Sequence, residues 1–227
     1  MTLKFPDYSV VIPAFNAGNF IGQTIQSVLD QTHPPVKIVV VDDGSSDNLA
    51  KALTDYEAQI TLIRQANQGP ATATALGFQS VKTDYVATTD ADDIWHADKI
   101  EKQFLTLEKM PDIDIIFSQM DSFGEDIATA KINSEHAGWS RTTMLLHRSA
   151  YDRVGPFEDM PGRRGEMVDW IAQARSMNIG IHMLEEVLAS RRIHKGSLSW
   201  GRNPDQDRGY MEAVLRALKR RKESQNK

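Results

Sequence analysis

The 227-residue sequence contains no cysteine, which excludes disulfide bonds, thiol nucleophiles and cysteine-ligated zinc sites. It also lacks any apolar run of the roughly 18–20 residues that a membrane-spanning helix needs. The apolar run near the N-terminus is short and is broken by Pro13, so it does not have the layout of a signal peptide. These absences predict a protein of a reducing, cytoplasmic compartment.

Excess positive charge is absent as well, because the formal net charge is −5. Such a chain has no general affinity for nucleic acid backbones, so we expect no nucleic acid partner. Its hydrophobic content of 41% and charged content of 25% are ordinary for a globular protein. No proline- or glycine-rich linker divides it, and its length fits one large domain, residues 1–227.

The first half of the sequence alternates between predicted strands and predicted helices. Continuous runs rich in valine and isoleucine predict buried strands near 8–15, 37–43, 60–65 and 84–90. The segments between them predict helices near 20–31, 48–59 and 69–82. Strand–helix alternation with short connections predicts an α/β fold with a mostly parallel central sheet flanked by helices.

The second half is less regular. It predicts a helix at 96–110, a strand at 113–120, a strand and a short helix within 140–155, and a helix at 165–178. One or two strands are expected over 179–194, and a basic amphipathic helix is expected to end the chain from 205 onward.

Polar clusters follow three of the predicted strands, at Pro13–Asn16, Asp42–Asp47 and Asp90–Asp93. Ligands of such sheets bind beyond the carboxyl ends of the strands. The clustering therefore predicts one binding site at one edge of the sheet.

Four motifs occur in order along the chain: VVIPAFN, VVVDDGSSD, NQG and TDADDIWHADKIEKQ. Together with the later VGPFED and RRIHKGSLS, they resemble the family 2 glycosyltransferases, which have the GT-A fold. The resemblance implies transfer of a sugar from a nucleotide-sugar donor, most simply a UDP-sugar, to an acceptor. It also implies a divalent cation, Mg²⁺ or Mn²⁺, and inversion at the anomeric carbon. On this basis residues of about 8–110 form the donor-binding half, 111–200 the acceptor-binding and catalytic half, and 201–227 a basic C-terminal helix.

The segment Asp90-Ala91-Asp92 resembles the DXD motif of that family. The resemblance implies that Asp92 ligates the metal, while Asp90 binds the ribose or the waters of the metal. Physical chemistry agrees, because neighbouring carboxylates repel one another and a cation relieves the repulsion. A structural alternative is that Asp92 or Asp93 caps a helix beginning at Ile94.

The segment around Asp42 and Asp43 resembles the part of the family that reads the nucleotide base. A carboxylate has only acceptors, so it suits the N3–H group of uracil. A turn with no binding role is the structural alternative for these two residues. The resemblance adds further donor-binding positions, namely Pro13, Ala14, Phe15, Asn16, Asn67 and Gly69.

An inverting transfer needs a carboxylate that takes the proton of the acceptor hydroxyl group. When Trp170 is aligned with the tryptophan-bearing helix of the family, Glu166 falls at the position of the base. Asp169 lies one turn further on and is the rival candidate. The structural alternative is that both are acidic residues favoured at the start of a helix.

His194 lies in a segment that resembles the one that closes over the diphosphate in the family. The resemblance implies that His194 completes the metal shell with Asp92, or contacts phosphate. In one place the sequence departs from the family, because Thr74-Ala75 stands where relatives often carry an Arg-Asn pair that holds the diphosphate. Arg64, or a basic residue of the C-terminal segment, is the candidate replacement.

Two other functions stay open on the sequence alone. A nucleotidyltransferase would need a glycine-rich basic loop after the first strand, and the segment NAGN has no basic residue. A non-catalytic nucleotide-binding module would explain Thr74-Ala75.

The chemistry of the acceptor is not indicated. The C-terminal helix is either a solvated basic tail or a weak peripheral contact with the inner face of a membrane.

Overall fold

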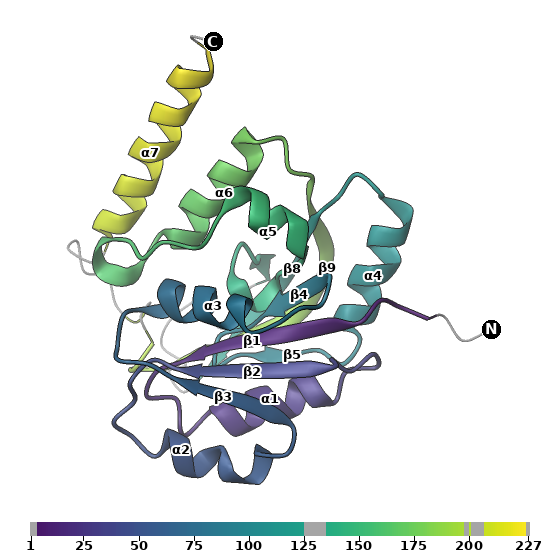
Figure 1. The fold of residues 1–227 in the computed structure, drawn as a ribbon, viewed down its shortest axis with the longest axis vertical. Coiled ribbons are helices and arrows are strands. Elements are labelled where there is room, and N and C mark those ends of the chain that lie inside the picture. The colour runs from purple at the N-terminus through teal and green to yellow at the C-terminus, as the bar shows by residue number, and fades with distance from the viewer. Residues whose placement is uncertain (1–3, 125–134, 198–199, 201–206, 226–227) are drawn as a thin grey trace.

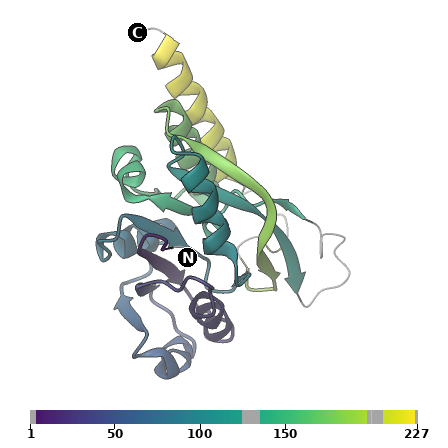
Figure 2. The same cartoon turned by 90° about the vertical axis from the view of Figure 1, so that its right-hand side faces the viewer.

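The computed structural model describes residues 4–124, 135–197, 200 and 207–225. A central sheet is covered by helices on both faces, and the last helix extends away from the body of the molecule (Figure 1). Figure 2 shows the same protruding helix after a turn of 90° about the vertical axis. Among the helices of these ranges, none combines the length and apolarity needed to cross a bilayer.

Four parallel strands form the first half of the sheet, in the order β3-β2-β1-β4. They are β1 (Tyr8–Ala14), β2 (Lys37–Asp42), β3 (Ile60–Arg64) and β4 (Tyr85–Thr88). The connecting helices are α1 (Ile21–Leu29), α2 (Leu49–Ala52) and α3 (Pro70–Gln79). The helix expected over 48–59 is shorter than predicted, because α2 ends after four residues and a 3₁₀ turn, Thr54–Tyr56, follows it.

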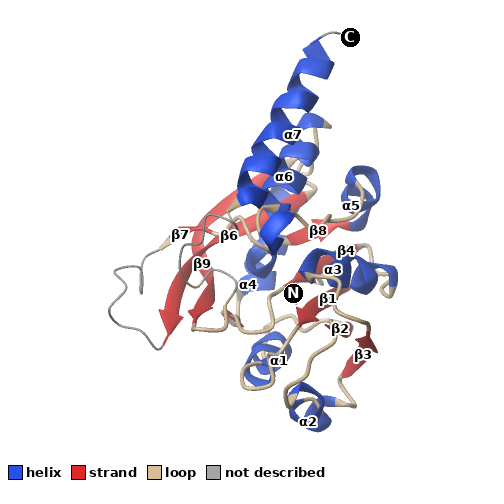
Figure 3. Ribbon diagram, turned by 90° about the vertical axis from the view of Figure 1, so that its left-hand side faces the viewer, coloured by secondary structure: helices blue, strands red, loops and turns tan. Residues whose placement is uncertain are grey.

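The sheet continues beyond β4 with mixed strand directions, in the order β8-β6-β9-β5, and β7 pairs with β6 (Figure 3). These strands are β5 (Ile94–Trp95), β6 (Ile115–Gly124), β7 (His136–Ala137), β8 (Leu145–His147) and β9 (Ile181–Ile193). The helices of this half are α4 (Lys99–Lys109), α5 (Arg148–Val154), α6 (Glu166–Ser176) and α7 (Arg208–Gln225).

One expectation about the acidic segment is wrong. No helix begins at Ile94, because Ile94 and Trp95 pair with β9 as the short strand β5. Helix α4 begins only at Lys99, after Asp98. Neither Asp92 nor Asp93 therefore caps a helix.

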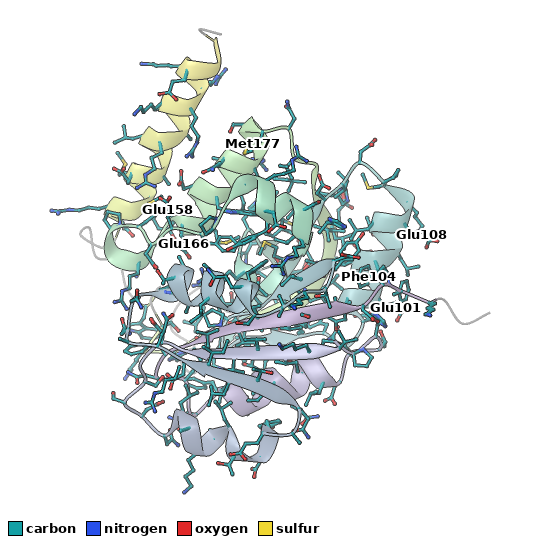
Figure 4. All side chains as sticks on the ribbon, viewed as in Figure 1. Glu101, Phe104, Glu108, Glu158, Glu166 and Met177 are labelled. Atoms are coloured by element: carbon teal, nitrogen blue, oxygen red, sulfur yellow. The ribbon has the colours of Figure 1, made fainter. Side chains whose placement is uncertain are left out.

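Side chains alternate between the two faces of the sheet, so the core has two parts. Along β1, Val10 and Ile12 pack on one face with α1 and α4, whereas Val11 packs on the other face with α3, α5 and α6. Phe104 of α4, labelled in Figure 4, belongs to the first part. In the second part the ring of Phe78 stacks on that of Tyr151, with centroids 4.1 Å apart.

Helix α3 approaches β1 closely at Gly77. A Cβ atom added at this glycine would lie only 2.2 Å from Cγ1 of Val11, which is fully buried. At the other end of the helix, the N–H of Gly69 donates to Oδ2 of Asp43, so the N-terminus of α3 lies beside the end of β2.

We predict that Gly77→Ala lowers the free energy of unfolding by about 1–3 kcal/mol, since the methyl group overpacks the core against Val11. Gly22→Ala on α1 is the matched control, because its Cβ would lie 3.6 Å from Tyr56, an ordinary contact distance. That change should stabilise the protein slightly, by about 0.4–1 kcal/mol, through the unfolded state. Denaturant unfolding measures both values, and equal effects of the two substitutions would contradict the close approach.

Candidate active site

A cavity of about 570 Å³ opens at the carboxyl ends of β1, β2 and β4. Its size is in the range that small-molecule ligands occupy. The N-terminus of α6 and the first turn of α7 form the opposite wall. The candidate residues that line it are Pro13, Ala14, Phe15, Asn16, Asp43, Asp90, Ala91, Asp92, Glu166 and His194.

The turns after β1 and β2 are bonded to each other. The backbone N–H of Asn16 donates to Oγ of Ser45 at 2.9 Å, and the N–H of Ser46 donates to Oδ1 of Asn16 at 2.9 Å. The N–H of Asp43 donates to the carbonyl of Ala14 at 2.8 Å. Asn16 adopts a φ of 52°, a conformation that asparagine tolerates better than most residues. Two of the predicted clusters therefore form one surface.

Asp42 and Asp43 have different surroundings. Asp42 is directed away from the cavity, where Oδ1 accepts from the N–H of Ser45 at 2.8 Å and Oδ2 lies 3.2 Å from Nε of Arg64. Of the two carboxylates, only that of Asp43 belongs to the cavity wall. Arg64, the candidate replacement for the missing basic residue, is thus engaged with Asp42 rather than placed in the cavity.

The carboxylate of Asp43 accepts three hydrogen bonds within the protein. Oδ1 accepts from Nε2 of Gln65 at 2.7 Å and from the N–H of Gln68 at 2.8 Å, and Oδ2 accepts from the N–H of Gly69 at 2.9 Å. Because a carboxylate offers about four acceptor positions, one remains for a ligand.

Asn67 and Gly69 lie behind the cavity wall rather than in it. Oδ1 of Asn67 accepts from Nη2 of Arg163 at 2.6 Å, and Arg163 does reach the cavity. Gly69 has a φ of +103°, and a Cβ there would lie 2.4 Å from Oδ1 of Asp159. Thr74, at the position of the departure from the family, is fully buried, and its hydroxyl group donates to the carbonyl of Pro70.

Asp92 and His194 meet at the floor of the cavity. Nε2 of His194 lies 2.9 Å from Oδ2 of Asp92, and the ring of His194 packs on Phe20 with centroids 4.4 Å apart. The two residues are far apart in the sequence but project a carboxylate oxygen and an imidazole nitrogen toward one point. Within the ranges that the structure describes, no three side chains of the metal-ligating kinds gather around one position.

Asp93, the third carboxylate of the acidic segment, is held by hydrogen bonds from two other segments. It is buried, and it accepts from Oγ1 of Thr142 at 2.5 Å and from the N–H of Arg192 at 2.9 Å. Burial, reinforced by the charges of Asp92 and Asp90, raises the pKa of Asp93 well above its ordinary value. Asp93 thus joins the acidic segment to the end of β9.

A buried arginine that the sequence analysis did not identify connects the remaining acidic residues. Nε of Arg141 lies 2.9 Å from Oδ1 of Asp90, and Nη1 lies 2.6 Å from Oε1 of Glu166. Burial opposes the charge of the guanidinium, but the negative charges of Asp90 and Glu166 outweigh it and raise the pKa of Arg141. No local pattern in the sequence distinguishes this arginine from a surface one.

Arg141 stands in a 3₁₀ turn, Arg141–Thr143, whose three carbonyl groups each accept a buried hydrogen bond. Oγ1 of Thr88 donates to the first, Nε1 of Trp95 to the second and Nε2 of Gln103 to the third, each at 2.7 Å. Gln103 in turn accepts from Nζ of Lys99 at 3.0 Å. Side chains from β4, β5 and α4 therefore fix the position of Arg141.

Asp169, the rival of Glu166, points to another surface. Its carboxylate contacts Nη2 of Arg220 and lies 3.6 Å from Nη1 of Arg216, both on α7. It is not part of the cavity wall, whereas Glu166 is. The two acidic residues of α6 thus face different neighbours.

Comparison with known proteins shows what the chain is similar to. The family model for glycosyl transferase family 2 matches residues 9–163. An uncharacterised glycosyltransferase of Nostoc sp. is 41% identical over 209 residues, which cover 82% of this chain and 64% of the relative. A Bacillus subtilis glycosyltransferase named for teichuronic acid biosynthesis, TuaG, is 38% identical over 122 residues, covering 52% of this chain and 47% of the relative. The chain thus spans less than two thirds of the length of these relatives.

Solved structures share the fold at low sequence identity. Staphylococcus aureus TarS 1–349, solved with UDP-GlcNAc, has a TM-score of 0.75 at 17% identity, over 94% of this chain and 66% of that one. The mannosyltransferase PcManGT of Pyrobaculum calidifontis, solved with GDP-Man and Mn²⁺, has a TM-score of 0.67 at 16% identity, over 94% of this chain and 70% of that one. The α/β GT-A fold expected from the motifs is confirmed.

We predict that Gln103→Met lowers the free energy of unfolding by about 1–3 kcal/mol. Methionine keeps the size of the side chain, but it leaves the carbonyl of Thr143 and the buried amine of Lys99 without their partner. Gln59→Met, at an exposed position, should change stability by less than about 0.5 kcal/mol. Denaturant unfolding compares the two, and an equal loss would show that the turn around Arg141 does not depend on Gln103.

Proposed function

The chain belongs to glycosyl transferase family 2, and on this premise we propose that it transfers a sugar from a nucleotide diphosphate-sugar to an acceptor hydroxyl group. One observation carries the proposal. A single cavity joins an acceptor group for a nucleotide base, Asp43, a potential phosphate and metal site, Asp92 with His194, and a carboxylate on the opposite wall, Glu166. These are the parts that such a transfer needs, in one space of sufficient size.

The structural neighbours support the class of donor. TarS 1–349 was solved with UDP-GlcNAc and PcManGT with GDP-Man, so each takes a sugar linked to a nucleoside diphosphate. In the present chain the remaining acceptor position of Asp43 matches the N3–H group of uracil. Phe15, half exposed beside it, offers an apolar surface to the nucleotide. We therefore infer that the donor is a UDP-sugar.

The pair of Asp92 and His194 fits a divalent cation. Their facing oxygen and nitrogen atoms, 2.9 Å apart, can both turn to one ion. Oxygen ligands suit Mg²⁺ and Mn²⁺, and phosphate oxygens of the donor would supply the rest of the shell. When bound, the ion would stabilise the negative charge on the leaving diphosphate. Asp90, held by Arg141, is left to contact the ribose or the waters around the ion.

We assign the role of general base to Glu166. Its Oε1 is held by Arg141, so the carboxylate cannot rotate away, and its second oxygen can take a proton. In the proposed step the acceptor oxygen attacks the anomeric carbon, the bond to the diphosphate oxygen breaks, and the hydroxyl proton passes to Glu166. Attack opposite the leaving group inverts the anomeric carbon.

A non-catalytic nucleotide-binding module is the second candidate, and one observation favours it. Neither residue expected to stand for the Arg-Asn pair lines the cavity, since Thr74 is buried and Arg64 is bonded to Asp42. Arg163 and Arg191, which line the cavity, can contact the diphosphate in its place. Release of UDP from a UDP-sugar, with no release of pyrophosphate, separates a glycosyltransferase from a binding module and from a nucleotidyltransferase.

The metal assignment predicts a nucleotide affinity that depends on Mn²⁺. UDP should bind the wild type more tightly with Mn²⁺ than without it, and Asp92→Asn should abolish that difference while keeping metal-free binding. UDP should also bind more tightly than CDP, because uracil N3 carries a hydrogen that the carboxylate of Asp43 can accept and cytosine N3 carries none. Titration calorimetry measures each of these affinities. Equal binding of UDP and CDP would reject the role of Asp43, and an unchanged Mn²⁺ effect in the variant would reject that of Asp92.

The assignment of the base predicts the effect of Glu166→Gln. This change keeps the size of the side chain and a contact with Arg141 but removes the proton acceptor. It should lower kcat about 10²–10⁴-fold and leave the affinity for the donor nearly unchanged. Steady-state release of UDP, measured with the acceptor or as donor hydrolysis, tests this.

Asp169→Asn is the matched control, since it alters the other acidic residue of the same helix. Because Asp169 faces α7 rather than the cavity, kcat should stay within a few-fold of the wild type. Normal turnover of Glu166→Gln together with a loss in Asp169→Asn would transfer the role of base to Asp169.

A further inference from the structure

Helix α7 has its polar and apolar faces reversed with respect to the body of the protein. A helix on the surface of a globular protein usually buries an apolar face and exposes a charged one. In α7 the face toward the body carries charged residues, and the face toward solvent carries the large apolar ones. The helix also extends beyond the body, as Figures 1 and 2 show.

The inner face of α7 is held by small residues and ion pairs. Gly209 and Ala213 are buried against the body, and Arg220 contacts Asp169 of α6. Nη1 of Arg216 lies 2.8 Å from Oε2 of Glu158, which is labelled beside the start of α7 in Figure 4. These contacts fix which side of the helix points outward.

The outer face of α7 is apolar over most of its first three turns. At 100° per residue its apolar side chains fall on an arc of about 140°, opposite the buried residues. Within the part of the chain that the structure describes, these side chains remain between 45% and 65% exposed. They are Tyr210, Met211, Val214, Leu215 and Leu218.

The charge of α7 contrasts with that of the whole chain. The helix contains six basic residues and two acidic ones, a net charge of +4, whereas the chain as a whole carries −5. Two of the basic residues, Lys219 and Lys222, are exposed in its last turns. At 100° per residue, Lys222 continues the apolar arc toward the end of the helix and Lys219 lies about 40° beyond one edge of it. An exposed apolar arc with lysines beside it is typical of a helix that lies in a membrane interface.

We propose that the outer face of α7 docks on the surface of an anionic lipid bilayer. The apolar arc would enter the boundary between headgroups and acyl chains, and the lysines would remain at the level of the anionic headgroups. An anionic surface complements the charge of +4, whereas pairing the same faces of two copies would bring two cationic helices together. Tyr210 belongs both to this face and to the wall of the cavity, so docking brings the mouth of the cavity to the bilayer.

Binding to lipid vesicles tests this proposal without any substrate, so its failure is distinct from failure of the proposed function. Wild-type protein should sediment with vesicles of phosphatidylglycerol and phosphatidylcholine, and at least about tenfold less with vesicles of phosphatidylcholine alone. Leu215→Glu should lower binding to the anionic vesicles by at least about tenfold, because it places a carboxylate in the apolar arc.

Val36→Glu is the matched control, because Val36 and Leu215 are each 58% exposed and Val36 lies just before β2. It makes the same change in charge and should keep wild-type binding. Lys219→Ala/Lys222→Ala should also weaken binding, whereas Lys51→Ala/Lys109→Ala removes the same charge from exposed positions outside α7 and should not.

The proposal is overturned if the wild type shows no preference for anionic vesicles, or if Leu215→Glu and Val36→Glu bind alike. It is also overturned if the wild type does not bind vesicles but forms dimers that Leu215→Glu dissociates in light scattering. That result would assign the outer face of α7 to contact with a second copy.

Discussion

The buried guanidinium of Arg141 is the interaction on which the cavity depends. It lies between Asp90, at the end of β4, and Glu166, at the start of α6, so it joins the two walls. Without this cation, a carboxylate from each wall would remain with no positive charge between them, and like charges disfavour each other. The protein secures the arginine by bonding all three carbonyl groups of its turn, so its position is set by the fold rather than by one contact.

The order of the strands explains why the acidic residues gather at this place. The chain runs outward from β1 through β2 to β3 and then returns to β4 on the other side of β1. The segments that follow β1 and β4 lie side by side, because Oγ1 of Thr24 on α1 donates to the carbonyls of Ala91 and Asp93. Ligands of such sheets bind beyond the carboxyl ends of the strands, where these segments begin. Pro13–Asn16 and Asp90–Asp93 follow these two strands, and they form one side of the cavity. The acidic cluster is tolerated because cationic or hydrogen-bonding groups from β9 and the turn of Arg141 face it.

These features differ in how far the sequence predicts them. The parallel strands and the clusters at their ends are local patterns, so they could be placed before the structure was known. Three features depend on contacts between distant segments and carry no local pattern: the bridge made by Arg141, the ion pair of Asp42 with Arg64, and the ion pairs that Asp169 makes with α7. The short strand β5 was missed for the same reason, since its partner is β9, almost a hundred residues further along the chain.

Helix α6 connects the cavity with α7. Glu166 and Asp169 are three residues apart, so their side chains leave the helix in directions that differ by about 60°. That offset is enough for one to reach Arg141 and the other to reach Arg220. The backbones of Gly165 and Gly209 also meet just before Glu166, where a Cβ on Gly165 would lie 2.8 Å from the carbonyl carbon of Gly209. The start of α7 therefore packs directly on the start of α6, the helix that carries the proposed base.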